Sequence, residues 1–315
     1  MGNNQNELES IIDNNKNIQL DNNIKKYLEI LETIIPEELR NNFYTNLSQV
    51  RIINNDNSIQ KTYFGANNNA TGKYIESSNT ITILSNYIYN STIQEGYDEN
   101  EAYKCIYQCL LHELIHMASS SYNKETGEIS SGFNNPNSLK NTGLTEGLIE
   151  TISSAIVKPK HNINSGYNIE RYIVNQLMII IGQNTMIYSL FANKGTQFLE
   201  EKLNSITNEP ELSYELFRHI ETIHAQKTHI TKTEELEKVQ NILLNYLSQK
   251  IVNLEQENKI SEIENILKTY SRWFITKDKL LKLGYDPHIY INLEKNEDHF
   301  NEIINKYQEQ TKHIR

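Results

Sequence analysis

The chain has 315 residues, 37% of them hydrophobic, and its 40 acidic and 30 basic residues give a net charge of −10. This length is enough for one large domain or two ordinary ones, and the recurrence of Ile, Leu and Tyr at helical spacing excludes a disordered chain. The acidic balance, without any basic stripe, argues against nucleic acid as a partner.

The N-terminal segment shows no targeting signal. Residues 1–20 are rich in Asn with scattered charges, and we expect a poorly ordered tail there. They lack the basic start and apolar core of a signal peptide. The longest apolar run, at 177–181, is far too short to span a bilayer. The sequence therefore predicts a soluble cytoplasmic protein without a membrane partner. Separately, the heavy use of Asn, Ile and Lys is typical of an AT-rich bacterial genome.

The next segment predicts helices followed by strands. Residues 24–35 have helical periodicity, and Pro36 is suited to the first turn of a second short helix. From Val50 onward the sequence changes to short runs of β-branched and aromatic residues, separated by Asn, Gly and Ser. These runs predict strands at 50–53, 61–64, 73–76 and 80–84.

A long helix is predicted over about 99–117, and it contains the sequence His112-Glu113-Leu114-Ile115-His116. Residues four apart on an α-helix lie on the same face. His112 and His116 can therefore point their imidazole nitrogens at one metal ion. Glu113, about 100° round the helix, can reach a water on that metal.

A second helix with two carboxylates follows. Residues 119–141 predict a hairpin or irregular loop with a turn at Thr126-Gly127, and Pro159 closes the helix that comes next. Glu146 and Glu150 lie four residues apart on this helix. Zinc held by two imidazoles needs a third protein ligand, which Glu146 could supply. Glu150, one turn later, could accept the remaining N–H of a ligand histidine and fix its tautomer.

The two segments together resemble the gluzincin branch of zinc metallopeptidases, which pair HExxH with a downstream ExxxD/E helix. Over about 103–157 the chain is similar to uncharacterised bacterial zincin-like proteins with HELxHxAS, SGF and LNEGxTE segments, here at 112–119, 131–133 and 144–150. It departs from them in having Thr145 where Asn is common, and from the thermolysin type in having Glu150 where Asp is usual. A metzincin is disfavoured, because that branch needs Gly and His where this chain has Ser119 and Tyr122.

The resemblance implies an α+β, predominantly helical fold. Its zincin-like core, at 21–160, would combine a small mixed or antiparallel sheet with the HExxH helix, and a helical lobe at 161–315 would follow. The implied cofactor is Zn²⁺ and the implied substrate a peptide or protein. Glu113 would then be the general base.

The oxyanion-stabilising donor is not fixed by the motif. Tyr167, His161 and Tyr122 are the candidates, and we prefer Tyr167, in a Tyr-x-x-Glu segment. The remaining histidines have no ligand-like spacing to the motif, and we expect surface or core positions for them: His219, His224, His229 and His288.

Two cysteines lie on the ligand side of the HExxH helix: Cys109 is one turn before His112, and Cys105 is two turns before it. They could contribute to metal binding. The simpler interpretation is that they are small buried hydrophobes, since a His/His/Glu zinc site needs no thiolate.

The part of the chain after Tyr167 predicts helices only. The expected ranges are 168–181, 186–204, 211–225, a long helix opened by a capping box at 231–234, one around 260–270 and one near 291–307. The sequence as a whole favours a zinc-dependent metallopeptidase. The alternatives are a catalytically inactive zincin-fold module for metal binding or protein interaction, and an effector or toxin-type protease.

Overall fold

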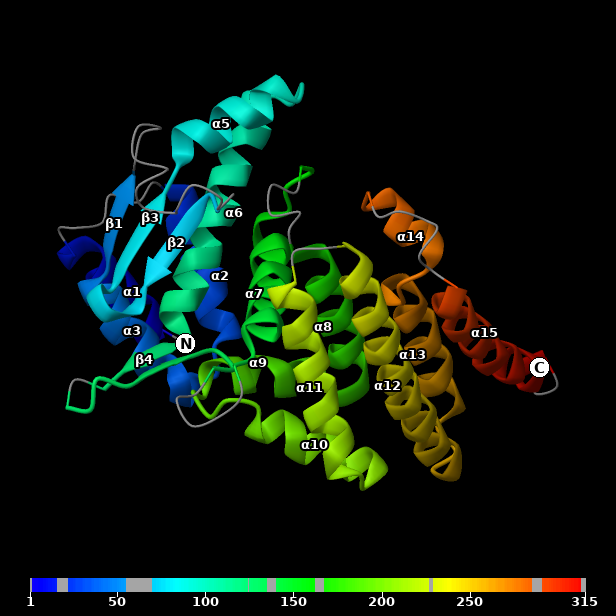
Figure 1. Ribbon diagram of the computed structural model, residues 1–315. Coiled ribbons are helices and arrows are strands. Elements are labelled where there is room, and N and C mark those ends of the chain that lie inside the picture. The colour runs from blue at the N-terminus through cyan, green and yellow to red at the C-terminus, as the bar shows by residue number, and fades with distance from the viewer. Residues whose placement is uncertain are drawn as a thin grey trace. The chain divides into compact units, whose positions relative to one another are not determined.

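The computed structural model shows a predominantly helical chain with a small sheet, compatible with an α+β fold (Figure 1). The residues described are 2–15, 22–54, 70–123, 125–134, 140–161, 167–226, 229–284 and 291–312. Their contacts divide the chain into two compact units. Unit 1 comprises 1–138, 149–166 and 187–195, and unit 2 comprises 139–148, 167–186 and 196–315.

The sheet of unit 1 has the order β1-β3-β2, formed by β1 (Arg51–Asn54), β3 (Thr80–Ile83) and β2 (Gly72–Ile75). β1 runs parallel to β3, and β2 runs antiparallel to it. The sheet is therefore mixed, with the wholly buried β3 in its centre. The strands expected at 50–53, 73–76 and 80–84 are confirmed, whereas the one expected at 61–64 lies outside the described residues.

The helices of unit 1 pack around α6 (Glu99–Ala118), which contacts β2 and β3 as well as α2 (Asn22–Ile34), α3 (Arg40–Gln49) and α5 (Ser85–Gln94). The 3₁₀ turn η1 (Glu37–Leu39) precedes α3, and η2 (Glu76–Ser78) joins β2 to β3. Asp98 caps the start of α6 by accepting the backbone N–H of Glu101 at 2.8 Å.

The C-terminal end of α6 is held by two amides from α3. Asn42 donates to the carbonyl of Ala118 at 3.2 Å, and Asn46 donates to that of Met117 at 2.8 Å. The last carbonyls of a helix have no partner within it. These bonds therefore fix the turn that carries the second histidine of the motif.

The N-terminal segment differs from the expected tail. Residues Gly2–Asn14 form α1, in which Leu8 and Ile12 are buried. The amide of Asn15 donates to the carbonyls of Leu47 and Val50 at 2.8 and 3.1 Å. These tertiary contacts order a segment whose Asn-rich composition predicts disorder, and residues 16–21 lie outside the described part.

After α6 the chain forms a two-stranded antiparallel hairpin, β4 (Ser120–Tyr122) and β5 (Ile129–Ser131). Its turn contains Gly127 at a φ of 71°, as expected from the Thr126-Gly127 pair. α7 (Thr142–Val157) follows as one continuous helix, and the division between the units falls within it, after Leu148.

Unit 2 is made of helices, whose bounds are α8 (Asn168–Ile181), α10 (Gln197–Thr207), α11 (Pro210–Ala225), α12 (His229–Gln256), α13 (Ile260–Trp273), α14 (Lys277–Lys282) and α15 (Ile291–Lys312). α12 contacts α8, α10, α11, α13 and α15 and is thus the central helix of this unit. The two units follow the expected division at residue 160 only in part, because 139–148 belongs to unit 2 and 187–195 to unit 1.

Two helix predictions are wrong. The helix expected over 186–204 is split into α9 (Gln183–Phe191) and α10, because Asn193 and Gly195 adopt positive φ angles of 54° and 61° that end a right-handed helix. α12 begins at His229, before the capping box expected at 231–234, so Thr231 lies within its first turn.

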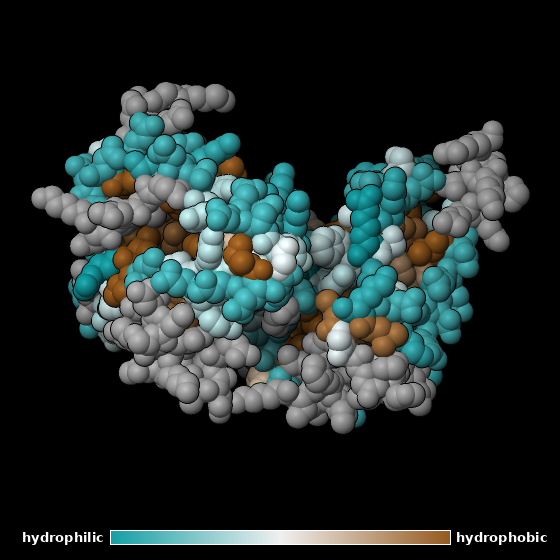
Figure 2. Space-filling model, turned by 90° about the horizontal axis from the view of Figure 1, so that it is seen from above, coloured by the Kyte–Doolittle hydropathy of each residue, from teal (hydrophilic) through white to brown (hydrophobic). Residues whose placement is uncertain are grey.

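No helix in the described part of the chain is long and apolar enough to cross a membrane. On the face shown in Figure 2, most of the coloured residues are hydrophilic, with apolar residues between them.

Candidate metal centre

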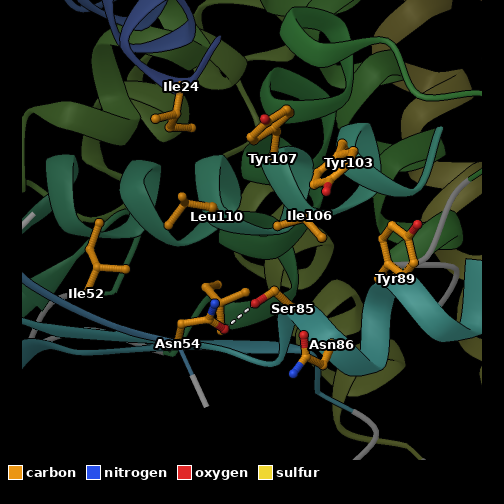
Figure 3. Close-up of a pocket in the computed structure, with 11 residues that line it drawn as sticks. Ile24, Ile52, Asn54, Ser85, Asn86, Tyr89, Tyr103, Ile106, Tyr107 and Leu110 are labelled. Atoms are coloured by element: carbon orange, nitrogen blue, oxygen red, sulfur yellow. Dashed lines mark hydrogen bonds between the residues drawn. The ribbon is translucent and has the colours of Figure 1, made fainter. Parts of the chain in front are cut away.

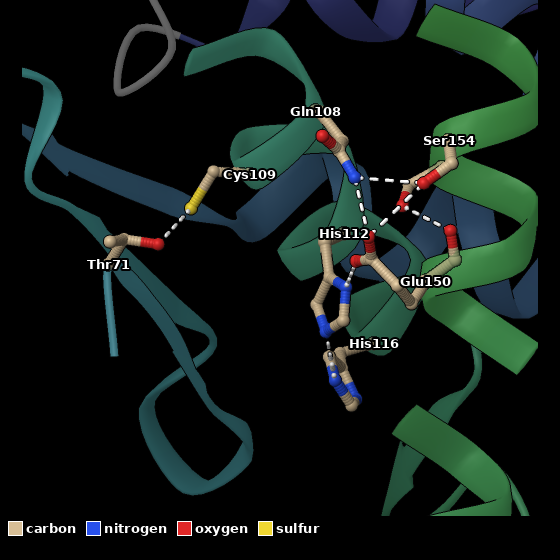
Figure 4. A network of polar contacts seen from close by, with 8 residues as sticks. Thr71, Gln108, Cys109, His112, His116, Glu150 and Ser154 are labelled. Atoms are coloured by element: carbon tan, nitrogen blue, oxygen red, sulfur yellow. Dashed lines mark hydrogen bonds and ion pairs between the residues drawn. The ribbon is translucent and has the colours of Figure 1, made fainter. Parts of the chain in front are cut away.

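The histidines of the HExxH motif lie side by side on α6. Their Nε2 atoms are 3.2 Å apart, and their ring centroids are 5.0 Å apart (Figure 4). His112 is buried and His116 is half-buried. Two imidazole nitrogens on one tetrahedral zinc ion would be separated by about 3.3 Å, given bonds of about 2.0–2.1 Å. The spacing in the protein is close to that value.

A carboxylate on α7 orients the first histidine. Glu150 Oε2 lies 3.1 Å from His112 Nδ1, and this carboxylate is fully buried. Its other oxygen accepts hydrogen bonds from Gln108 at 2.6 Å and Ser154 at 3.1 Å (Figure 4). A carboxylate at Nδ1 holds the proton there and leaves the Nε2 lone pair for a metal. The contact predicted for Glu150 is thus present.

The third predicted ligand comes from the same helix. Glu146 precedes Glu150 by one turn of α7, and ligand atoms of His112, His116 and Glu146 all lie within 4.8 Å of one another. Among the described residues, this is the cluster of His, Cys, Asp or Glu able to hold a metal ion. The group could therefore bind a metal, and its two nitrogens and one carboxylate suit zinc or another borderline divalent cation.

Glu113 lies beside the start of the edge strand β2. Its side chain is 8% exposed, and a Cβ added at Gly72 would come within 2.9 Å of Glu113 Oε1. The same Cβ would lie 2.9 Å from Cys109 Sγ. Only a glycine lets the strand backbone pass this close, so β2 and α6 together define the position of the carboxylate.

Comparison with protein-family models, with curated protein sequences and with solved structures found no match to this chain. The functional interpretation therefore depends on the chemistry of the residues that the fold brings together.

The two cysteines lie apart from the ligand cluster and are buried. Burial raises the pKa of the Cys105 thiol to about 11, and it raises that of Cys109 further, with help from the charge of Glu113. Cys109 Sγ lies 3.2 Å from Thr71 Oγ1 (Figure 4). Thiols with such pKa values stay protonated at neutral pH, which favours their interpretation as small core residues.

The three candidates for the oxyanion donor lie in different parts of the structure. His161 is bound near the start of α6, where its backbone N–H donates to Glu101 at 2.8 Å and its ring centroid lies 4.7 Å from that of Tyr97. Glu101 precedes His112 by eleven residues, which is about 16 Å along a helix, so His161 is too distant. Tyr122 is 43% exposed at the end of β4. Tyr167 stacks on His224 with ring centroids 6.0 Å apart.

His224 is a residue that sequence spacing did not identify. Its Nδ1 lies 3.3 Å from Oε1 of the buried Glu170. Burial works to lower the pKa of His224, but the hydrogen bond and charge of Glu170, with the charges of Glu146 and Glu221, raise it above 6.5. His224 thus lies within electrostatic range of the third ligand.

Two glycines of α7 permit this arrangement within unit 2. A Cβ at Gly143 would lie 2.7 Å from His224 Cβ, and one at Gly147 would lie 2.7 Å from the carbonyl oxygen of Glu170. The helices that carry these residues can approach only because α7 has no side chains there. The Gly-x-x-x-Gly spacing around Glu146 was the available signal, although it indicates close packing and not a particular partner.

His219, in contrast, has a structural role. It is buried on α11 and forms a short hydrogen bond with Glu235 of α12. A core position is one of the two expected for it, surface or core, whereas His229 and His288 have no described side-chain placement.

Proposed function

We propose that this chain is a zinc-dependent metallopeptidase with a zincin-like core, which hydrolyses peptide bonds with Glu113 as the general base. The convergence of His112, His116 and Glu146 is the observation that carries the proposal. A group of two histidines and one carboxylate is the ligand set of hydrolytic zinc sites such as those of thermolysin and carboxypeptidase A, which keep a fourth position open.

When bound, zinc would supply a Lewis acid that polarises the scissile carbonyl and increases the acidity of a water molecule. Glu113 would take the proton from a water at the site and pass it to the leaving amine nitrogen. Its confinement between α6 and Gly72 limits the positions that the carboxylate can adopt. Glu150 keeps His112 in the tautomer needed for coordination.

The tetrahedral oxyanion needs a hydrogen-bond donor, a contribution of roughly 3 kcal/mol. Tyr167 is the donor predicted from sequence, and His224, which stacks on Tyr167 and bonds to Glu170, is a second candidate. If His224 donates, His224→Gln lowers kcat much more than Tyr167→Phe. The opposite order supports Tyr167.

The decisive experiment combines metal content with cleavage. Purified wild type should contain close to one zinc per chain by mass spectrometry of its metals, and His112→Ala and Glu146→Ala should lose it. Glu264→Ala is the matched control, since this carboxylate is exposed on α13 and should leave the metal content unchanged.

Glu113→Gln should retain zinc and lose the cleavage of casein and of a mixed fluorogenic peptide library. Wild-type activity in this variant would refute the general-base role. Zinc binding by the wild type without any peptide cleavage would instead favour the inactive metal-binding module.

A further inference from the structure

Unit 1 contains a cavity of about 490 Å³ that is distinct from the metal centre (Figure 3). It lies between α6 on one side and the strands β1 and β3 with the start of α5 on the other. Its volume is in the range of small-molecule sites, roughly 300–1,000 Å³.

The cavity uses the face of α6 that points away from the metal ligands. Tyr103, Ile106, Tyr107 and Leu110 line it. At about 100° per residue, these positions lie between about 120° and 220° round the helix from His112. One helix thus presents the metal ligands on one face and a cavity wall on the other, so an occupant of the cavity would not touch the metal site directly.

The wall formed by α6 belongs to a continuous array of tyrosine rings. Centroid distances are 5.9 Å from Tyr27 to Tyr107, 6.4 Å from Tyr107 to Tyr103, and 5.7 Å from Tyr103 to Tyr89. Tyr103 is 49% exposed, although large aromatic side chains are usually buried. A ring array that remains accessible beside a cavity offers apolar faces to a flat or ring-shaped ligand.

The opposite wall combines two isoleucines, Ile52 and Ile83, with uncharged polar side chains. Asn54, Ser85 and Asn86 contribute to it, and a hydrogen bond joins the hydroxyl of Ser85 to Asn54 Oδ1 (Figure 3). Carboxamides and hydroxyls both donate and accept hydrogen bonds. Among the described residues that line the cavity, none is Asp, Glu, Lys, Arg or His. A charged ligand would therefore lose its hydration without gaining a counter-charge.

We infer that this cavity binds a neutral saccharide, with one face of a pyranose ring stacked on the tyrosine array and its hydroxyls bonded to Asn54, Ser85 and Asn86. The described part of the lining offers no basic group to a phosphate, which disfavours nucleotides and sugar phosphates. A proline-rich peptide also uses tyrosine-lined sites. The saccharide is favoured because Asn54, Ser85 and Asn86, opposite the tyrosines, can pair with hydroxyls in both directions.

The test is titration of full-length protein with maltose, cellobiose and N,N′-diacetylchitobiose, followed by calorimetry and by saturation-transfer NMR. Glucose 6-phosphate and a proline-rich decapeptide are the competitor probes. We expect at least one neutral disaccharide to bind with a Kd of about 10 mM or below. Tyr103→Ala should weaken this binding about tenfold or more, and Tyr103→Phe should retain it.

Tyr87→Ala is the matched control, because Tyr87 is 41% exposed on α5 and does not line the cavity. It should bind the disaccharide as wild type does, and zinc content should be unchanged in all variants. The inference is overturned if no neutral disaccharide binds at about 50 mM. It is equally overturned if Tyr103→Ala binds normally while its thermal unfolding shows a folded protein, or if the decapeptide binds in place of the sugars.

Discussion

Replacement of Gly72 by Ala tests whether the edge strand positions Glu113, the proposed general base. The added Cβ would lie 2.9 Å from Glu113 Oε1, from Cys109 Sγ and from Ile83 Cδ1. Three contacts below the normal van der Waals separation cannot all be relieved by one side-chain rotation. Because α6 and the buried β3 are fixed by the core, the carboxylate of Glu113 is the group with the most freedom to move.

The expected effect is much larger on catalysis than on stability. Overpacking of a well-packed site destabilises a protein by about 1–3 kcal/mol, which lowers Tm by a few degrees in a chain of this size. A displacement of a catalytic group by about 1 Å can reduce the rate about 100-fold. Gly72→Ala should therefore remain folded and keep its zinc while kcat/KM falls by about two orders of magnitude.

The assay is cleavage of a fluorogenic peptide under matched zinc loading, with thermal unfolding measured in parallel. A second variant supplies the control. Cys109→Ala removes one of the three contacts, so the double variant Gly72→Ala/Cys109→Ala should recover part of the activity that Gly72→Ala loses. If Gly72→Ala cleaves like wild type, or if it loses zinc along with activity, the positioning argument is wrong.

Two further predictions concern the hydrogen bonds around the site. Glu150→Gln keeps the size of the side chain but removes the charge beside His112 Nδ1, so zinc affinity measured against a chelator should fall by about 10–100-fold; unchanged affinity would exclude the orienting role. Glu170→Gln removes the partner that raises the pKa of His224. Because the pKa of His224 is higher in the folded protein than in the unfolded chain, its protonation stabilises the fold fully below about pH 6.5. This stabilisation is lost once the pH rises above the folded-state pKa. Urea unfolding should thus show Glu170→Gln to be less stable than wild type at about pH 5.5, with a smaller difference at about pH 9, and an equal loss at both values would contradict the linkage.

The candidate metal ligands could be predicted from sequence because their geometry is local. His112 and His116 belong to one helix, and Glu146 and Glu150 belong to another, so helical periodicity alone determines which pairs share a face. Sequence could not determine that the second helix lies against the first. The hydrogen bond from His112 to Glu150 supplies this information.

The failures come from contacts between distant segments. The Asn-rich composition of 1–20 predicts a tail, but burial of Leu8 and Ile12 and the bonds made by Asn15 order α1. α5 had no prediction, since its Ser, Asn and Tyr residues have weak helix propensity and are stabilised by packing on α6. His224 lies 54 residues after Glu170, and only the packing of unit 2 brings the two side chains together.

The abundance of asparagine is the clearest case in which structure changes the meaning of a sequence feature. As composition, it indicates only a genomic bias. In the fold, the amides of Asn42 and Asn46 hold the last turn of α6, and the amide of Asn79 in turn donates to the backbone carbonyl of Asn46 at 2.8 Å. A carboxamide suits this task because it donates two hydrogen bonds without burying a charge. His116 is in the last turn of the same helix, so these neutral bonds hold the turn that carries it without placing a charge beside the candidate metal centre.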